Sequence, residues 1–97
     1  MPVELLYFTA TAEDNIRVKT EWKTAAEINN DYFTIERSAS PSSLSSLNEA
    51  NSMAWEQIGT VQGAGNSSST ISYVFYDEHP YTGVSYYRLR QTDYDGG

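Results

Sequence analysis

The sequence predicts an all-β protein, an antiparallel β-sandwich of about six strands that forms one domain over residues 1–97. Hydrophobic and polar residues alternate with a period of two in several segments, and Gly, Asn, Asp and Ser gather between those segments. Eight tyrosines, three phenylalanines and two tryptophans add the aromatic content that is typical of strands.

The strands are predicted, in chain order, at residues 3–10, 16–22, 32–38, 55–61, 70–76 and 83–92. Alternation is blurred in the first segment, as is common for an edge strand. It is clearest in the second, where one side carries Ile16, Val18, Thr20 and Trp22. The buried indole N–H of Trp22 is expected to need a hydrogen-bond partner. In the third segment Phe33 and Ile35 are expected to point inward, with Tyr32, Thr34 and Glu36 outward.

The last segment, within Gly83–Gly96, is interpreted as a central strand that ends in a tight turn at Asp95-Gly96. Its inward side would carry Ser85, Tyr87, Leu89 and Gln91. Its outward side would carry Tyr86, Arg88, Arg90 and Thr92. Arg88 and Arg90 are expected to form cross-strand ion pairs with Glu36 or Glu56.

Three connecting segments have less regular patterns. Thr24–Asp31 is predicted to be a loop with at most one helical turn, and Gly63–Ser69 a flexible connection. The Ser-rich segment 39–54 has two interpretations. The favoured one is a mobile loop; the other is a short helix, because Leu44, Leu47, Ala50 and Met53 share one helical face.

Composition excludes several kinds of partner. Six basic residues against thirteen acidic ones give a net charge of −7, which is unfavourable for nucleic acid or anionic lipid. The chain has no cysteine, so it has neither disulfides nor a thiolate metal site. No apolar run approaches the roughly 20 residues of a membrane-spanning helix. We therefore expect neither nucleic acid nor a membrane as partner.

The polar residues form no catalytic constellation that the sequence can reveal. His79 is interpreted as an exposed loop histidine, and the adjacent carboxylates Asp77-Glu78 and Glu13-Asp14 as solvated turn residues. Asp93-x-Asp95-Gly96 is interpreted as a plain turn, with a calcium site as the alternative. We expect no catalytic residue, no metal and no cofactor.

The aromatic residues divide into two groups. Five are expected to form the core: Trp22, Phe33, Tyr73, Phe75 and Tyr87. Tyr32 and Tyr86 fall on outward faces, and Trp55 could cover the same sheet or its edge. If their strands are neighbours, these three would form a shallow aromatic strip on which sugar rings could stack. Ordinary cross-strand packing is the alternative.

Several motifs in this chain resemble a known family. The motifs are P-V-E-L-L-Y-F-T-A, T-A-A-E-I-N-N-D-Y-F-T-I-E-R-S and S-Y-Y-R-L-R-Q-T-D-Y-D-G. They are similar to a fibronectin type III-like, immunoglobulin-like module of bacterial proteins exported by the type IX route. That module usually precedes a C-terminal sorting domain. The chain departs from the family pattern at residues 39–54, and it ends before the last strand that the resemblance implies.

The resemblance implies a non-catalytic accessory or spacer module of a larger secreted or cell-surface protein, for example a polysaccharide-degrading enzyme. Its partners would be other domains of the same polypeptide. The alternative is a module that binds polysaccharide or protein through Tyr32, Tyr86 and Trp55. Without a last strand, the segment 83–92 would present an unpaired edge, for which we expect edge-to-edge self-association, coverage by a loop of the chain, or marginal stability.

Overall fold

The computed structural model describes residues 3–14, 16–39 and 55–96, and these form five strands joined in one antiparallel sheet. The strands are β1 (Val3–Glu13), β2 (Arg17–Ser38), β3 (Glu56–Ser67), β4 (Ile71–Asp77) and β5 (Tyr86–Asp93). The described residues contain no helix, which confirms the all-β prediction. They accordingly include no helix that could cross a membrane. The two interpretations of the Ser-rich segment lie outside the described residues, except at Ala39.

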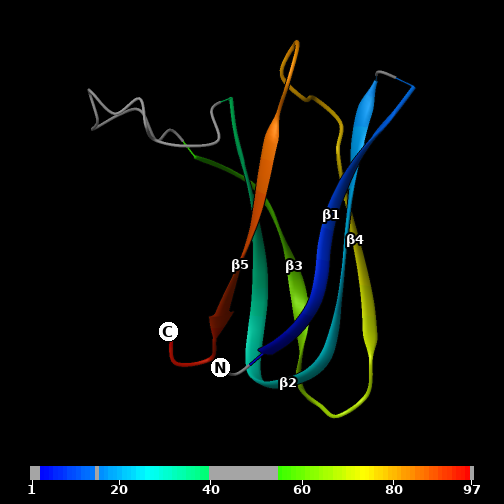
Figure 1. The fold of residues 1–97 in the computed structure, drawn as a ribbon. Coiled ribbons are helices and arrows are strands. Elements are labelled where there is room, and N and C mark those ends of the chain that lie inside the picture. Colours follow the sequence, from blue (N-terminus) through cyan, green and yellow to red (C-terminus); the bar gives the residue numbers. More distant parts are fainter. Residues whose placement is uncertain (1–2, 15, 40–54, 97) are drawn as a thin grey trace.

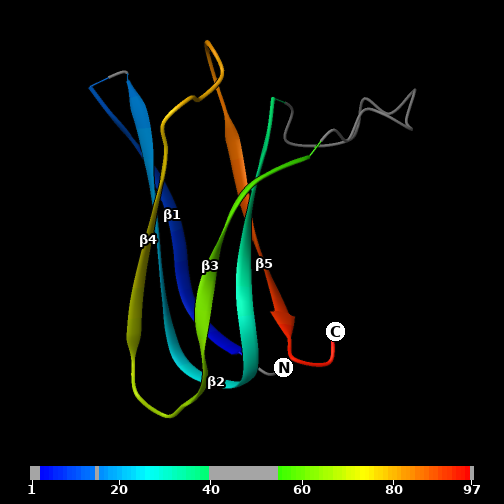
Figure 2. The same cartoon turned by 180° about the vertical axis from the view of Figure 1, so that it is seen from behind.

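Strand β2 lies at the centre of the whole arrangement. Its first half pairs with β1 and β4, and its second half pairs with β3 and β5. Between the halves the chain reverses direction, as both ribbon views show (Figure 1, Figure 2). Asn29 has a φ of 54° in this bend, a left-handed conformation that Asn tolerates better than most residues. Each half of β2 therefore forms a group of three with its two neighbours. The two groups face each other, which is consistent with a β-sandwich.

The continuity of β2 corrects the prediction of a loop at Thr24–Asp31 and reduces six strands to five. Alternation fails there because polar residues are buried: Thr24 and Asn30 are fully inaccessible, and Glu27 is 1% exposed. Their neighbours come from far along the chain, since Asn30 pairs with Gly65 on β3. The same pairing extends β3 to Ser67, where the sequence predicted a flexible connection.

Two further expectations need correction. The final strand begins at Tyr86, and among the described strands it pairs only with β2, so it is an edge strand and not a central one. Ile16, expected inward, is 66% exposed because it lies in the turn between β1 and β2, where its N–H donates to the carbonyl of Glu13. The blurred alternation of β1 coincides with two register shifts, on either side of Leu5.

The core lies between the two groups of strands. Trp22 stacks on Tyr73 at 5.5 Å between ring centroids, and it meets the ring of Phe33 edge-on at 5.4 Å. Such pairs contribute about 0.5–1.5 kcal/mol each beyond simple burial. Phe75 and Tyr87 pack against the same cluster, so the predicted aromatic interior is confirmed. The expected partner of the Trp22 indole N–H is not found among the described residues.

Candidate functional site

The predicted aromatic strip does not form a continuous surface. Tyr86 on β5 lies opposite Ser38 on β2, whereas Tyr32 on β2 lies opposite Thr92 on β5. Tyr32 and Tyr86 are thus separated by six residue steps along the strands, which is roughly 20 Å. They point to the same face of the β2–β5 pair, but from its two ends.

Trp55 lies near the Tyr86 end of this face. It directly precedes β3, whose first residue, Glu56, pairs with Arg37. The guanidinium carbon of Arg88 lies 4.4 Å from the Trp55 ring centroid, so one face of the indole is covered by a cation. Trp55 and Tyr86 therefore lie at the same end of this face, and Tyr32 lies at the other end.

Arginine side chains occupy the middle of the same face. Nε of Arg88 donates to Glu36 at 2.5 Å, and Nη1 of Arg90 donates to the other Glu36 oxygen at 3.3 Å. This confirms the predicted cross-strand ion pairs. Glu36 lies on the outward face as expected, but it is only 6% exposed because both arginines lie over it. One carboxylate thus faces two cations.

A buried polar cluster around Arg37 and Asp77 joins the two groups of strands at the end opposite the bend. Nη1 of Arg37 donates to both oxygens of Asp77, at 3.0 and 2.9 Å, and Nη2 donates to Glu56 at 2.7 Å. The hydroxyl of Tyr87 donates to Asp77 at 2.6 Å, and the ring of Tyr81 lies 4.4 Å from the guanidinium carbon of Arg37. Asp77 is 5% exposed, which corrects its interpretation as a solvated turn residue.

These contacts decide the protonation states in the cluster. Burial alone would raise the pKa of Asp77, but the hydrogen bonds from Tyr87, Arg37 and the backbone of His79 outweigh it and lower that pKa below its ordinary value. Burial and the bond to Asp77 raise the pKa of the Tyr87 phenol. Asp77 is thus held as a carboxylate beside a neutral phenol and a cation.

Another buried polar cluster lies at the bend, around Glu27. The Glu27 carboxylate accepts four hydrogen bonds, from Thr24 at 2.9 Å, Asn30 at 2.7 Å, the Ala64 N–H at 3.0 Å and the Tyr73 hydroxyl at 2.6 Å. Burial would raise the pKa of Glu27, but these donors lower it below its ordinary value. Glu27 and Asp77 are therefore both held as carboxylates and surrounded by hydrogen-bond donors. A general acid needs the opposite, a raised pKa and a free path to substrate.

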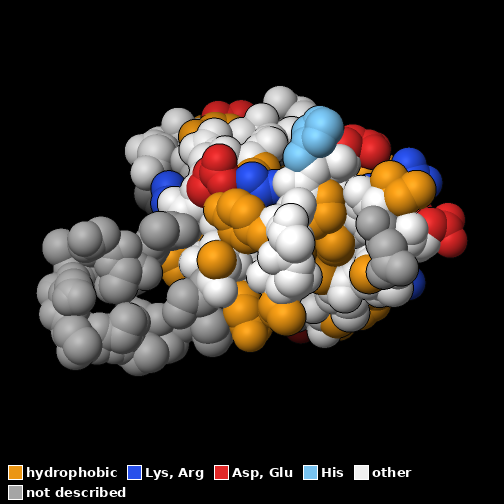
Figure 3. All heavy atoms as spheres, turned by 90° about the horizontal axis from the view of Figure 1, so that it is seen from above, with side chains coloured by type: hydrophobic (Ala, Val, Ile, Leu, Met, Phe, Trp, Pro, Cys, Tyr) orange, Lys and Arg blue, Asp and Glu red, His pale blue; other side chains and the backbone are white. Residues whose placement is uncertain are grey.

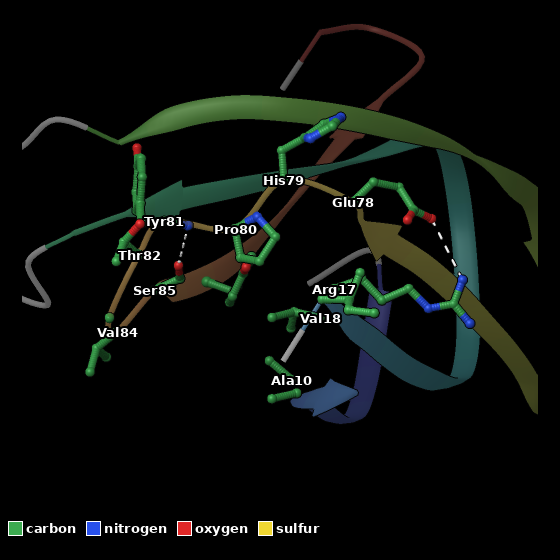
Figure 4. Close-up of a pocket in the computed structure, with 14 residues that line it drawn as sticks. Ala10, Arg17, Val18, Glu78, His79, Pro80, Tyr81, Thr82, Val84 and Ser85 are labelled. Atoms are coloured by element: carbon green, nitrogen blue, oxygen red, sulfur yellow. Dashed lines mark hydrogen bonds and ion pairs between the residues drawn. The ribbon is translucent and has the colours of Figure 1, made fainter. Parts of the chain in front are cut away.

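An open groove of about 780 Å³ lies at the end of the molecule that carries the turn between β1 and β2. Figure 3 views this end and shows hydrophobic side chains gathered beside the chain's only histidine, His79. The lining includes Ala10 and Val18 on one side and Pro80 and Val84 on the other (Figure 4). The His79 ring points away from Ala10, and it is exposed as predicted.

The described residues contain no group of three or more His, Asp or Glu side chains placed to hold a metal ion. At the end of β5 the Gly96 N–H donates to the carbonyl of Asp93 at 2.9 Å, and Gly96 has a φ of 83°. The predicted turn at Asp93-x-Asp95-Gly96 is thus confirmed as a turn.

Sequence reasoning missed Arg37 and Glu27. A signal for Arg37 was present, because the period of two that places Phe33 and Ile35 inward also places Arg37 inward. Glu27 lay in a segment with no strand pattern, and nothing local reports its donors on β3 and β4. Comparison with protein-family models, with curated proteins and with solved structures finds no match to this chain.

Proposed function

We propose that this chain is a non-catalytic accessory or spacer module, a fibronectin type III-like β-sandwich within a larger secreted or cell-surface protein. One observation carries the proposal: the buried ionisable groups join strands to one another. Arg37 and Asp77 link the second half of β2 to β4, and Glu27 links β2 to β3 and β4. The carboxylates of Asp77 and Glu27 therefore hold strands together and are already occupied by hydrogen-bond donors of the chain.

The pairing of the strands supports the sandwich. Each half of β2 has two antiparallel neighbours, and the aromatic cluster around Trp22 lies between the halves. Export and a position beside a sorting domain rest on the sequence resemblance alone.

Deletion of residues 1–97 from the full-length parent protein tests this function. An accessory role predicts that neighbouring domains keep their specific activity, while the amount of protein displayed or released changes. As a second arm, the isolated chain is incubated with chromogenic glycosides and esters. Turnover of any of these substrates by the isolated chain would overturn the proposal.

Polysaccharide binding is the second candidate, and the proximity of Trp55 to the Tyr86 end of β5 favours it. An indole held by Arg88 is a rigid platform with little side-chain entropy left to lose. Affinity electrophoresis on cellulose, xylan and other glucans tests it. Retardation that is lost in Tyr86→Ala and Trp55→Ala but kept in Tyr32→Ala would support binding at this end of the face. Equal retardation of all three variants would refute it.

A further inference from the structure

The outward face of the group formed by β3, the second half of β2 and β5 carries a net positive charge. Residues that pair across these strands point to the same side of the sheet, so the outward side chains form rows. Three such rows are Gln62, Tyr32 and Thr92; Thr60, Thr34 and Arg90; and Gln57, Glu36 and Arg88. They contain two arginines and one carboxylate, in a chain whose net charge is −7. A further strand beside β5 would extend the sheet in its own plane and would leave this face open.

The two arginines of this face use few of their hydrogen-bond donors within the described part of the chain. To the described residues, Arg88 donates only through Nε and Arg90 only through Nη1, in both cases to Glu36. The side chains are 48% and 59% exposed, so the other guanidinium N–H groups are open to solvent. Two residues apart on one face, the arginines stand about 7 Å from each other. Each planar fork of donors matches the two oxygens of a carboxylate.

Arg88 is held in position by the protein itself. Its Nε–H donates to Glu36, and its guanidinium carbon lies 4.4 Å from the centroid of the Trp55 ring. Stacking on an indole leaves the in-plane N–H groups of a guanidinium available to a ligand, and binding then costs little side-chain entropy. Tyr86, which is 36% exposed, precedes Arg88 by two residues and adds an aromatic ring on the same face. The face therefore presents aromatic rings beside two cationic forks.

We propose that this face binds an acidic polysaccharide, one whose sugar rings carry carboxylates. The sugar rings contact Tyr86 and Trp55, and the carboxylates accept hydrogen bonds from Arg88 and Arg90. The positive charge favours this ligand over a neutral glucan. The aromatic rings favour it over an acidic peptide, because the flat apolar face of a sugar ring packs on them. The inference rests on the polysaccharide binding proposed above as the second candidate, and it names the class of polysaccharide.

An oligomer of galacturonic acid and its methyl ester test this inference as a matched pair, because esterification removes the charge and keeps the sugar. Each is titrated into the 97-residue chain by calorimetry at pH 7, where the acid is ionised. We expect the acid to bind at least about tenfold more tightly than the ester, because the ester cannot form charge-assisted hydrogen bonds with the two arginines.

Variants assign the preference to this face. Arg88→Gln with Arg90→Gln should make the acid and the ester bind equally. Arg90→Gln alone keeps the contact between Arg88 and Glu36, so it tests the site even if the double variant unfolds, and it should reduce the preference. Lys19→Gln with Lys23→Gln makes the same change in net charge on the first half of β2 and should leave the preference intact.

Three results would overturn the inference. Equal binding of the acid and the ester to the unmodified chain would remove the acidic class and leave polysaccharide binding as a candidate. Binding of neither, together with no retardation on neutral glucans, would remove both. Binding of a polyglutamate peptide as tight as that of the galacturonic acid oligomer would assign the face to an acidic polypeptide.

Discussion

Nη1 of Arg37 on β2 donates to both carboxylate oxygens of Asp77 on β4, and this pair joins the two groups of strands at the end opposite the bend. The bend of β2 and the Glu27 cluster join them at the other end. Trp22, Phe33 and Tyr73 fill the space between the two polar clusters. The fold is therefore held by one aromatic layer and by buried charge at both ends.

Asp77→Asn should lower the free energy of unfolding by about 3 kcal/mol or more, because it leaves the guanidinium of Arg37 without its buried counter-charge and only with the exposed Glu56. Arg37 is 8% exposed and Asp77 is 5% exposed, so water replaces the lost contact poorly. Urea unfolding followed by tryptophan fluorescence measures the change. As a control, Lys19→Gln removes an ion pair with Glu21 at the surface and should leave the urea midpoint unchanged. Equal midpoints for both variants would show that the Arg37–Asp77 pair contributes no more than a surface contact.

Glu27→Gln should destabilise the protein at pH 7 by about 1–3 kcal/mol, since it replaces an acceptor-only carboxylate among four donors. The pKa of Glu27 is lowered in the folded state, so its contribution is complete above its unfolded pKa, near 4. That contribution is lost as the pH falls through the folded value. Urea midpoints measured from pH 7 to pH 3 should therefore converge for the two proteins on the acid side. A difference that stays constant over this range would contradict the role of the charge.

Tyr73 and Tyr87 should resist ionisation in alkaline solution. Burial, followed by the bonds to Glu27 and Asp77, raises the pKa of both phenols above the ordinary value near 10. Their contribution to stability is therefore present below pH 10 and is lost as the pH rises through the folded values. In an ultraviolet titration of the eight tyrosines, two should form phenolate only as the protein unfolds. Tyr73→Phe should leave one such late tyrosine. Simultaneous ionisation of all eight in the folded protein would contradict these hydrogen bonds.

Gly59→Ala should lower stability by about 1–3 kcal/mol through overpacking. A Cβ at Gly59 on β3 would overlap the ring of Phe75 on β4, so this ring can lie against the Gly59 backbone only because glycine has no side chain. Thermal unfolding measures the loss, with the exposed neighbour change Thr60→Ala as control. A melting temperature for Gly59→Ala equal to that of the control would show that the Phe75 ring does not lie against Gly59.

The strands could be predicted where apolar residues alternate with polar ones along the sequence. Phe33 and Ile35 alternate with polar residues, and Tyr87 and Leu89 do the same, so the period of two identified both segments. Between Thr24 and Asn30 that signal disappears because the inward residues are polar. Their burial depends on donors such as Tyr73, which lies 46 residues after Glu27. No local pattern reports such a partner.

At the candidate site, the sequence predicted which way side chains point but not how far apart they lie. The sequence placed Tyr32 and Tyr86 on outward faces, but the distance between them depends on the register of β2 against β5. Register follows from the partner strand and the turns, and neither is visible in the alternation of one segment. The Arg88–Glu36 pair could be anticipated because opposite charges on neighbouring strands attract over several registers. The stacking of Arg88 on Trp55 could not.

The central claim is that β2 folds back on itself, so that its two halves face each other across Trp22. Nuclear Overhauser effects from the indole protons of Trp22 test this directly. We predict strong cross-peaks to the ring protons of both Phe33 and Tyr73, whose centroids lie 5.4 and 5.5 Å from that of Trp22. Cross-peaks to Tyr73 without any to Phe33 would mean that the two halves of β2 do not pack together, and the account would be wrong.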